Sequence, residues 1–201
     1  MTDKRPESAI FRPKSWTSRL SLENMFSVSQ PLDVEIGCGK GRFLTALARK
    51  NPGRNFLGVD RLLARLRKVD GKISREGLTN VRLLRIEAAY AVEFLLQEAS
   101  VTTFYILFPD PWPKRRHHRR RLFEPVFMDS LHKTLVDGGC VYVTTDHLDY
   151  FERIHKLFTA DSRFGEVPPF LPSEDERSEF ETMFLRQNRP IGRCGFRKTG
   201  S

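Results

Sequence analysis

The sequence predicts an α/β fold in which a mostly parallel sheet is covered by helices on both faces. Short apolar runs alternate with amphipathic helical segments along the chain, which is typical of strand–helix–strand units. Four of the expected strands are also followed by an acidic residue: Asp60, Glu87, Asp110 and Asp146. Right-handed crossovers bring the carboxyl ends of parallel strands to one edge of the sheet, where ligands of this fold class bind. We therefore expect the functional site at that edge.

The expected strands are short apolar runs at residues 32–36, 56–60, 81–86, 101–108 and 140–145. The expected helices carry apolar side chains at helical spacing at residues 43–48, 62–76, 90–98, 125–135 and 148–158. Gly77 and the pair Gly138-Gly139 are expected to end helices, and Pro125 to open one. Prolines at positions 109, 111 and 113 exclude a helix after the fourth strand and predict a stiff, irregular loop.

The chain is long enough to bury one substantial core, so we expect a single main domain at residues 31–201. Residues 1–30 are mixed in polarity and predict an N-terminal arm with a short helix near residues 20–26. Towards the other end, a rigid connector at residues 167–172 leads into an acidic stretch at 173–181 and a basic tail at 186–198.

The composition points to a polyanionic partner. Lysine and arginine number 34 against 25 acidic residues, which gives a formal net charge of +9. The densest positive charge is the run Lys114–Arg121, directly after the proline-rich loop. A net positive charge with such a cluster predicts that the protein binds nucleic acid. The alternative is that the charge only keeps the protein soluble.

The cysteines at positions 38, 140 and 194 lie far apart and form no Cys-x-x-Cys pair. This spacing is typical of a reducing compartment and gives no zinc motif. His117 and His118 are adjacent, so their side chains point apart and we expect no metal site there. The sequence has no signal-peptide core and no apolar run long enough to span a membrane, so we expect a cytoplasmic protein.

Glycines at positions 37, 39 and 41 follow the first strand and allow the backbone to approach a ligand closely. A dinucleotide fingerprint requires a glycine where Arg42 stands, and the Gly-Lys-Ser/Thr ending of a P-loop is absent. With Glu35 before the glycines and Asp60 after the next strand, the pattern resembles the first two motifs of Rossmann-like methyltransferases, which bind S-adenosylmethionine.

The resemblance implies a role for each acid in holding S-adenosylmethionine. Glu35 would lie near the amino end of the cofactor, Asp60 would accept the ribose hydroxyls, and Glu87 would face the adenine amine. Gly37 and Gly39 would belong to the cofactor-binding loop. The alternative is a glycine turn that binds no ligand.

The loop after the fourth strand reads Phe-Pro-Asp-Pro-Trp-Pro-Lys at residues 108–114. Exocyclic-amine methyltransferases carry Asn/Asp-Pro-Pro-aromatic at this point in the fold, which is a different string. The loop closely resembles the signature of the tRNA (guanine-N7)-methyltransferases, a bacterial family that methylates the variable-loop guanine at position 46 of tRNA. The resemblance extends from about residue 30 to residue 198. It implies a Rossmann-like class I methyltransferase fold with a seven-stranded, mostly parallel sheet.

Matching positions imply further roles for individual residues. Asp110 resembles the catalytic acid of the family and also a cofactor contact, and Lys114 and Asp146 resemble substrate-binding residues. Ser178–Glu181 falls on the family motif Thr-x-Phe-Glu, so the implied substrate contacts there are Ser178, Phe180 and Glu181. The implied RNA-contacting residues are Arg116, His117, His118, Arg119, Arg120 and Arg121.

Guanine N7 carries a free lone pair at neutral pH, so no proton has to be removed before methyl transfer. We therefore expect Asp110 to orient the base or to stabilise the developing positive charge, and not to act as a general base. The sequence leaves three alternatives open: the same chemistry on another RNA, a non-catalytic RNA-binding protein with a vestigial cofactor site, and a dehydrogenase, which Arg42 disfavours. It also leaves open whether the protein is a monomer or a homodimer.

Overall fold

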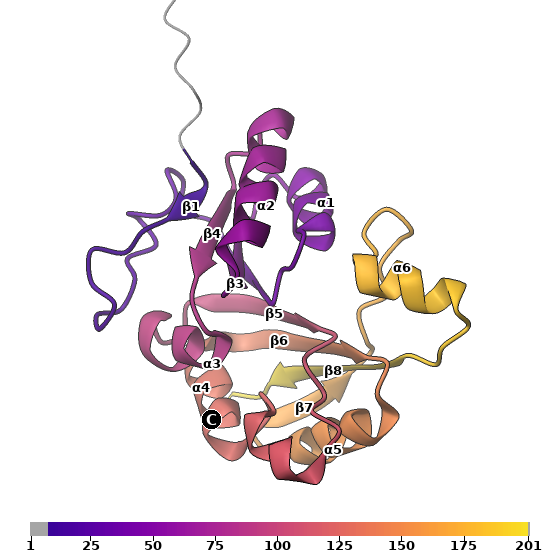
Figure 1. Ribbon diagram of the computed structural model, residues 1–201. Coiled ribbons are helices and arrows are strands. Elements are labelled where there is room, and N and C mark those ends of the chain that lie inside the picture. The colour runs from indigo at the N-terminus through magenta and orange to yellow at the C-terminus, as the bar shows by residue number, and fades with distance from the viewer. Residues whose placement is uncertain (1–7, 201) are drawn as a thin grey trace, which may run out of the picture.

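The computed structural model describes residues 8–200 and contains one twisted, mixed sheet (Figure 1). The order of the strands is β1-β4-β3-β2-β5-β6-β8-β7. Neighbouring strands from β1 to β6 pair in parallel, whereas β8 runs antiparallel to both β6 and β7. The strands are β1 (Ile10–Phe11), β2 (Leu32–Ile36), β3 (Asn55–Asp60), β4 (Val81–Arg85), β5 (Val101–Leu107), β6 (Leu135–Thr145), β7 (Phe164–Val167) and β8 (Gly192–Lys198).

Helices cover both faces of this sheet, as predicted. In Figure 1, α1 (Arg42–Lys50) and α2 (Leu63–Glu76) lie above the sheet. Below it lie α3 (Ala88–Tyr90), α4 (Pro125–Thr134) and α5 (Leu148–Thr159). Helix α3 continues into η1 (Ala91–Leu95), a short π-helix. Two further elements lie away from these layers: η2 (Arg115–Arg120), a 3₁₀ helix, and α6 (Glu179–Arg186).

The central strands are buried on both faces, and their side chains alternate between two cores. Val34 and Ile36 on β2 join the core under α3, α4 and α5, together with Ile106 of β5. Tyr105 of β5 instead packs with Phe43 of α1, on the opposite face of the sheet. Burial on both faces explains why β5 reads as a nearly continuous apolar run, whereas β2 alternates because it also buries Asp33 and Glu35.

The sheet has eight strands and not the seven that the family resemblance implies. The additional strand is β1, which pairs with β4 from within the predicted N-terminal arm. The helix predicted near residues 20–26 is wrong. Met25 and Phe26 close a single turn by donating backbone N–H bonds to the carbonyl of Leu22, and both side chains are buried in the core. The apolar residues of this segment are therefore buried from a single turn and not from one face of a helix.

The prediction that Gly138-Gly139 ends a helix is also wrong. Helix α4 ends at Thr134, and the glycines lie inside β6, where the pairing with β5 is irregular. Gly138 has a φ of 75°, and a Cβ on Gly139 would lie 2.9 Å from the carbonyl oxygen of Val136. The pair of glycines therefore permits a bulge in a strand, which a sequence pattern does not distinguish from a helix end. Likewise, the charged segment at residues 173–198 contains α6 and β8, which the sequence pattern did not predict.

Candidate active site

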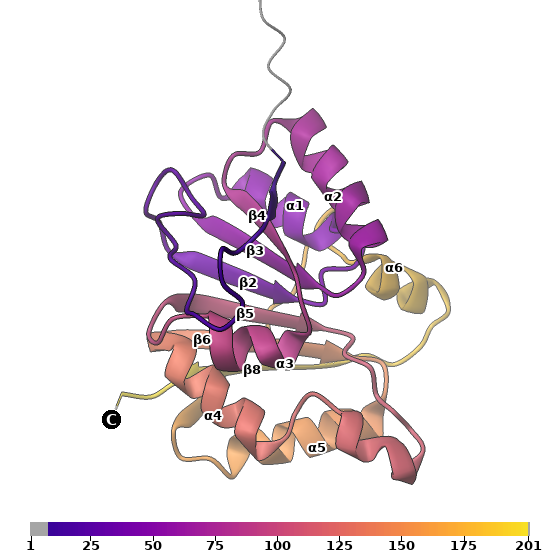
Figure 2. The ribbon, with the colours of Figure 1, turned by 60° about the vertical axis from the view of Figure 1, so that its left-hand side comes forward.

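The carboxyl ends of the parallel strands gather at one edge of the sheet, as predicted. In Figure 2 the arrowheads of the central strands point to the right, and α6 and the segment that follows β5 lie along that side. The glycine loop after β2 lies between the ends of β3 and β5, since these are the neighbours of β2 in the sheet. Four predicted acids, Asp60, Glu87, Asp110 and Asp146, follow the ends of β3, β4, β5 and β6.

The glycine loop is held by β3 and leaves room for a ligand. Gly37 and Cys38 donate their backbone N–H groups to the carbonyl oxygen of Val59, at 2.8 and 3.0 Å. Gly37 has a φ of 77°, and a Cβ there would meet nothing within 4 Å. Gly41 has a similar φ of 72°, but a Cβ there would lie 2.5 Å from the Val69 side chain. The first glycine therefore borders open space, and the last one lets the loop pack against α2.

Glu35 is the most unusual acid of this site. It is 3% exposed, and its Oε2 is buried without a hydrogen-bond partner in the part of the chain that the structure describes. Burial raises the pKa of the Glu35 carboxyl well above its ordinary value, and the nearby carboxylates of Glu179 and Asp60 raise it further. Buried polar atoms are normally paired, so this oxygen indicates a place for a cationic or hydrogen-bonding ligand.

Asp60 holds local backbone with both carboxylate oxygens, and Glu87 does so with one. Asp60 accepts the backbone N–H groups of Gly39 at 3.1 Å and Leu62 at 2.8 Å, so it links the glycine loop to the start of α2. Glu87 is exposed, and its Oε2 accepts the backbone N–H of Tyr90 at 3.0 Å. The unpartnered buried oxygen of Glu35 fits a ligand that carries an ammonium group, as S-adenosylmethionine does. Each Asp60 oxygen already accepts one backbone N–H and keeps a further acceptor site for a hydroxyl.

The proline-rich loop after β5 is rigid and strained. Phe108 and Trp112 have positive φ angles of 53° and 42°, which non-glycine residues rarely adopt. Such a conformation costs about 1–3 kcal/mol at each residue and persists where the surrounding structure enforces it, often at functional sites. Phe108 donates its backbone N–H to the carbonyl of Thr144 at 2.7 Å, which ties the loop to β6. Asp110, at the centre of the loop, is exposed.

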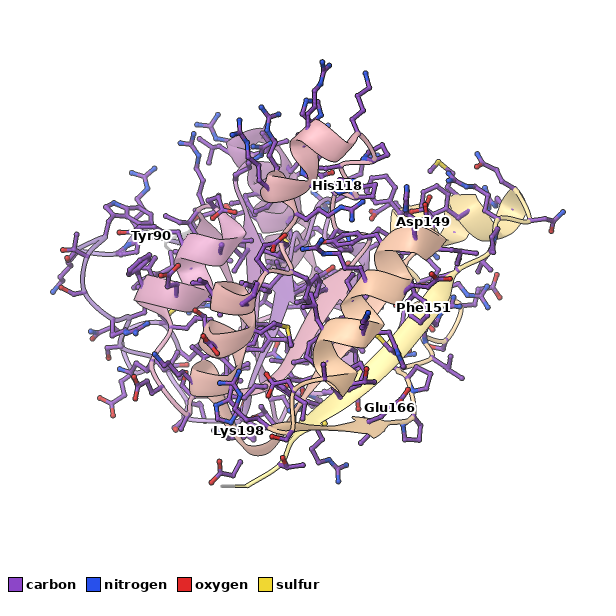
Figure 3. All side chains as sticks on the ribbon, turned by 90° about the horizontal axis from the view of Figure 1, so that it is seen from below. Tyr90, His118, Asp149, Phe151, Glu166 and Lys198 are labelled. Atoms are coloured by element: carbon purple, nitrogen blue, oxygen red, sulfur yellow. The ribbon has the colours of Figure 1, made fainter. Side chains whose placement is uncertain are left out.

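The basic segment folds back on the proline-rich loop. The guanidinium carbon of Arg120 lies 5.0 Å from the centre of the Trp112 ring, and His117 meets the same ring edge-on at 5.8 Å. Figure 3 shows η2 at the margin of the fold, beside the label of His118. Lys114, Arg116, Arg119 and Arg120 are exposed, and the two histidines are half-buried.

Arg121 differs from the other arginines of this segment. It is 7% exposed, its Nε donates to the carbonyl oxygen of Pro111 at 2.7 Å, and its guanidinium lies 4.7 Å from the centre of the buried Tyr150 ring. This geometry anchors the loop on α5 and does not present the side chain to a macromolecule. The resemblance implies an RNA contact for Arg121, whereas from its burial we propose a scaffold role for it.

The predicted substrate acids are paired with arginines that sequence reasoning missed. Asp146 Oδ2 lies 2.6 Å from Arg189 Nη2, and the buried Glu181 accepts Arg193 Nη2 at 2.5 Å. Arg193 is the second residue of the last strand, and the antiparallel direction of β8 brings it to the carboxyl edge. No local signal in the sequence pairs residues that lie so far apart.

The segment Ser178–Glu181 forms the start of α6. The Ser178 Oγ accepts the backbone N–H of Glu181 at 3.1 Å and caps the helix. Phe180 is 49% exposed, and its ring centre lies 6.3 Å from that of Phe108 in the proline-rich loop. The structure thus brings two of the predicted substrate segments into contact. The Ser-x-x-Glu capping pattern is the signal by which α6 could have been found.

Comparison with known proteins bears on the chemistry of this edge. A family model described as "Putative methyltransferase" matches residues 29–194. A tRNA (guanine-N(7)-)-methyltransferase of Halorhodospira halophila is 34% identical over 86% of this chain and 77% of its own length. The enzyme of the same name from Rubrobacter xylanophilus is 33% identical over 87% of this chain and 79% of its own length. The chain belongs to the tRNA (guanine-N(7)-)-methyltransferase family.

The fold agrees with this membership. The crystal structure of the 16S rRNA methyltransferase KamB superposes with a TM-score of 0.66 over 89% of this chain and 93% of that chain, at 16% sequence identity. The predicted family and the predicted class I methyltransferase fold are therefore confirmed. Members of this family are enzymes, and S-adenosylmethionine is the cofactor of the class.

Residues 8–200 contain neither a membrane-spanning helix nor a metal-binding cluster. None of the helices there has the length and apolar character needed to cross a membrane. Nor does that part of the chain hold a group of three or more His, Cys, Asp or Glu side chains arranged as metal ligands. Cys38 is buried beside the glycine loop, and burial raises the pKa of its thiol, which suits a packing role and not that of a nucleophile.

Proposed function

We propose that this protein transfers a methyl group from S-adenosylmethionine to N7 of guanine in tRNA, at position 46 of the variable loop, and so forms 7-methylguanosine. The observation that carries the proposal is the strained Phe108–Lys114 loop in a member of this family. This loop follows β5, which pairs with β2, and the glycine loop follows β2. When bound, S-adenosylmethionine supplies an electrophilic methyl group.

The cofactor would be held at the ends of β2, β3 and β4. Glu35, with its unpartnered buried oxygen, would accept the ammonium group of the cofactor. Asp60 would accept the ribose hydroxyls, and the open side of Gly37 would admit the ligand close to the backbone. The proposed cofactor-binding residues also include Gly39, Glu87 and Asp110, the last of which follows the end of β5.

The base would be recognised by carboxylates, because guanine presents N1–H and N2–H₂ donors beside its N7 acceptor. Asp146 and Glu181 each have one carboxylate oxygen in an ion pair with an arginine, which fixes the orientation of the second oxygen. Lys114, Ser178 and Phe180 complete the proposed substrate set. An adenine would place an acceptor opposite these oxygens and would therefore bind less well.

Asp110 would act by position and charge. N7 needs no deprotonation, so the reaction depends on aligning N7 with the methyl group, and alignment can supply several kcal/mol. A carboxylate on a loop fixed by prolines and by Arg121 can either orient the guanine or stabilise the charge that grows on the methylated ring.

The exposed part of the basic segment would bind tRNA phosphates. Arg116, Arg119 and Arg120 are exposed on η2, and planar guanidinium groups suit phosphate oxygens. His117 and His118 are half-buried and would contribute at the base of the same surface. We propose tRNA as the partner, the cytoplasm as the location, and a monomer or homodimer as the assembly.

The test is incubation of the purified protein with labelled S-adenosylmethionine and bulk tRNA, followed by nucleoside analysis. We expect label in 7-methylguanosine, and sequencing of the modified tRNA should place it at position 46. Label in another nucleoside, or in another RNA but not in tRNA, would refute the assignment. Binding of tRNA without turnover, and no heat of binding with S-adenosylhomocysteine, would indicate a non-catalytic RNA-binding protein.

A further inference from the structure

Helix α2 carries a second concentration of positive charge, which the proposed site does not use. Its inner face packs into the fold through three fully or nearly buried residues, Leu66, Val69 and Ile73. On a solvent-facing side, basic residues recur every three or four positions and so form one continuous row along the helix. This row, called the α2 stripe below, consists of Arg65, Lys68, Lys72 and Arg75 on α2 together with Arg61, which precedes the helix.

The charges of the α2 stripe are largely left without acidic partners. Among the described residues, one member of the stripe lies within ion-pair distance of an acid: Arg65, at 3.6 Å from Asp60. The acids of α2 itself are engaged elsewhere. Asp70 accepts the backbone N–H of Ala9 at 2.7 Å, and Glu76 pairs with Arg49 at 2.7 Å. Like charges at helical spacing disfavour a helix, so the row is costly unless an anionic partner binds it.

The stripe begins at the proposed active site. Arg61 directly follows Asp60, and the row then runs along α2 from Arg65 to Arg75, away from the carboxyl edge, for about 15 Å at 1.5 Å per residue. The exposed Arg85 at the end of β4 extends it, since its Nε donates to the carbonyl oxygen of Arg61 at 3.4 Å. Figures 1 and 2 show α2 on the outside of the molecule.

The topology places the stripe and η2 on opposite sides of the glycine loop. Helix α2 follows β3, η2 follows β5, and β2 with its loop lies between these two strands. We propose that the α2 stripe binds the phosphate backbone of the same tRNA at a distance from the target guanine, so that the RNA spans the cofactor site between two basic surfaces. This inference rests on the proposed function.

The chemistry of the stripe favours RNA over other partners. The buried apolar residues Leu66, Val69 and Ile73 of α2 face the protein core, and the exposed apolar residues Leu62 and Ala64 lie only at its start, so the helix has no continuous apolar face to insert into a membrane. Protein interfaces are depleted of lysine and enriched in aromatic residues at their centres, and the stripe has no aromatic member. A row of cations without apolar neighbours matches a row of phosphates.

The test uses a variant in which the outer half of the stripe is neutral: Lys68→Gln, Lys72→Gln and Arg75→Gln together. These residues lie away from Asp60 and outside the proposed active site. A matched control removes the same charge elsewhere, from the exposed residues Lys133, Lys156 and Arg197, each also changed to Gln. Thermal unfolding and calorimetry with S-adenosylhomocysteine should give the same values for both variants.

The stripe variant should bind tRNA more weakly than the control. The slope of log Kd against log salt concentration should fall by about 0.7–0.9 for each phosphate that the protein no longer neutralises. The KM for tRNA should rise while kcat stays unchanged, since the stripe binds the RNA equally in ground and transition states. Equal affinities and equal salt slopes for the two variants would overturn the proposal.

Two further outcomes separate the explanations. Loss of poly-glutamate binding with unchanged tRNA binding would assign the stripe to an acidic protein, and the proposal would fail. A wild-type protein that binds tRNA without forming 7-methylguanosine would refute the proposed function only. The stripe would still be tested in that case, because its decisive readout is tRNA affinity and not turnover.

Discussion

Arg42 and Thr182 join the cofactor side of the proposed active site to its substrate side. Arg42 Nη1 donates to the Thr182 Oγ1 at 3.1 Å, and Nη2 of the same guanidinium donates to the carbonyl oxygen of Glu174 at 3.2 Å. At the other end of α1, Lys50 pairs with Asp175 and Glu176. Helix α1, which begins at the glycine loop, is thus attached at both ends to the segment that precedes and contains α6.

Arg42→Ala should loosen α6 and raise the KM for tRNA. Thr182→Val is the matched variant: it keeps the shape of the side chain and removes the hydroxyl, which accepts from Arg42 and itself donates to the carbonyl oxygen of Ser178 at 3.0 Å. Each variant loses two hydrogen bonds, and each loss should lower the free energy of unfolding by about 0.5–1.5 kcal/mol, measured by urea unfolding. Unchanged steady-state kinetics in both variants would mean that this hydrogen bond does not position the substrate segment.

Asp110→Asn should lower kcat by about 10²–10³-fold, the usual loss when one preorganised electrostatic group is removed from a transition state. The asparagine keeps the size of the side chain and loses its charge. The Kd for tRNA should change little, because the exposed arginines of η2 provide the proposed phosphate contacts. Single-turnover kinetics and filter binding give the two quantities. Normal turnover by the variant would remove Asp110 from the proposed mechanism.

The arginines of the basic segment should separate into two functional groups. Arg119→Gln with Arg120→Gln should weaken tRNA binding and lower the slope of its salt dependence by about 0.7–0.9 for each phosphate no longer bound. Arg121→Gln removes the bond to Pro111 and the packing on Tyr150, so it should lower the melting temperature and kcat instead. If Arg121→Gln affected only the salt slope, its assignment as a scaffold residue would be wrong.

Cofactor binding should be linked to the ionisation of Glu35. Its pKa is raised by burial, so the carboxyl remains protonated at pH values where an exposed glutamate is ionised. The ammonium group of the cofactor favours the ionised form, so binding should release a proton, and affinity should increase as the pH rises through the range in which Glu35 titrates. Calorimetry with S-adenosylhomocysteine in buffers of different ionisation enthalpy measures that proton.

The free protein should show the opposite dependence in its stability. A carboxyl whose pKa is raised by folding contributes stability that is complete below its unfolded pKa, and this contribution is lost as the pH rises to the folded pKa. Glu35→Gln should remove this part of the pH dependence from melting curves. A variant with the same pH profile as the wild type would contradict the linkage.

Gly37→Ala and Gly41→Ala form a matched pair for the glycine loop. Both residues have positive φ, so each alanine is strained, at a cost of about 1 kcal/mol or more. Only the Cβ at position 41 would collide with Val69, and overpacking should cost about 1–3 kcal/mol in addition. Gly37→Ala should instead lower cofactor affinity, because its Cβ would occupy the open side of the loop. Thermal unfolding and calorimetry distinguish the two effects, and equal losses of stability would contradict the difference.

Much of the fold was predictable because local patterns determine it. The strands from β2 to β6 and the α-helices between them were predicted to within a few residues, apart from the start of β6, whereas the 3₁₀ helix η2 was not predicted. Helix α6 was not predicted because the acidic residues of its first turn interrupt the short apolar pattern. Ser178 and Glu181 nevertheless form a capping pattern that would have indicated its start. Strand β8 was missed because its basic residues resemble a solvated tail.

The acids of the proposed site were predictable from their positions after strands, whereas their arginine partners were not. Arg189 and Arg193 meet Asp146 and Glu181 only through the antiparallel return of β8. The burial of Arg121 likewise depends on Tyr150, a residue of another helix. A sequence pattern cannot distinguish this arginine from its exposed neighbours, because the difference arises in tertiary packing.

The antiparallel direction of β8 also has a consequence for biosynthesis. The proposed site combines Glu35, from the first long strand, with Glu181, whose partner Arg193 belongs to the last strand. A ribosome must therefore synthesise the chain to at least Arg193 before this ion pair can form. A chain that ends between Glu181 and Arg193 would retain the glycine loop but lack the counter-charge of Glu181, so it should not compete for tRNA guanine.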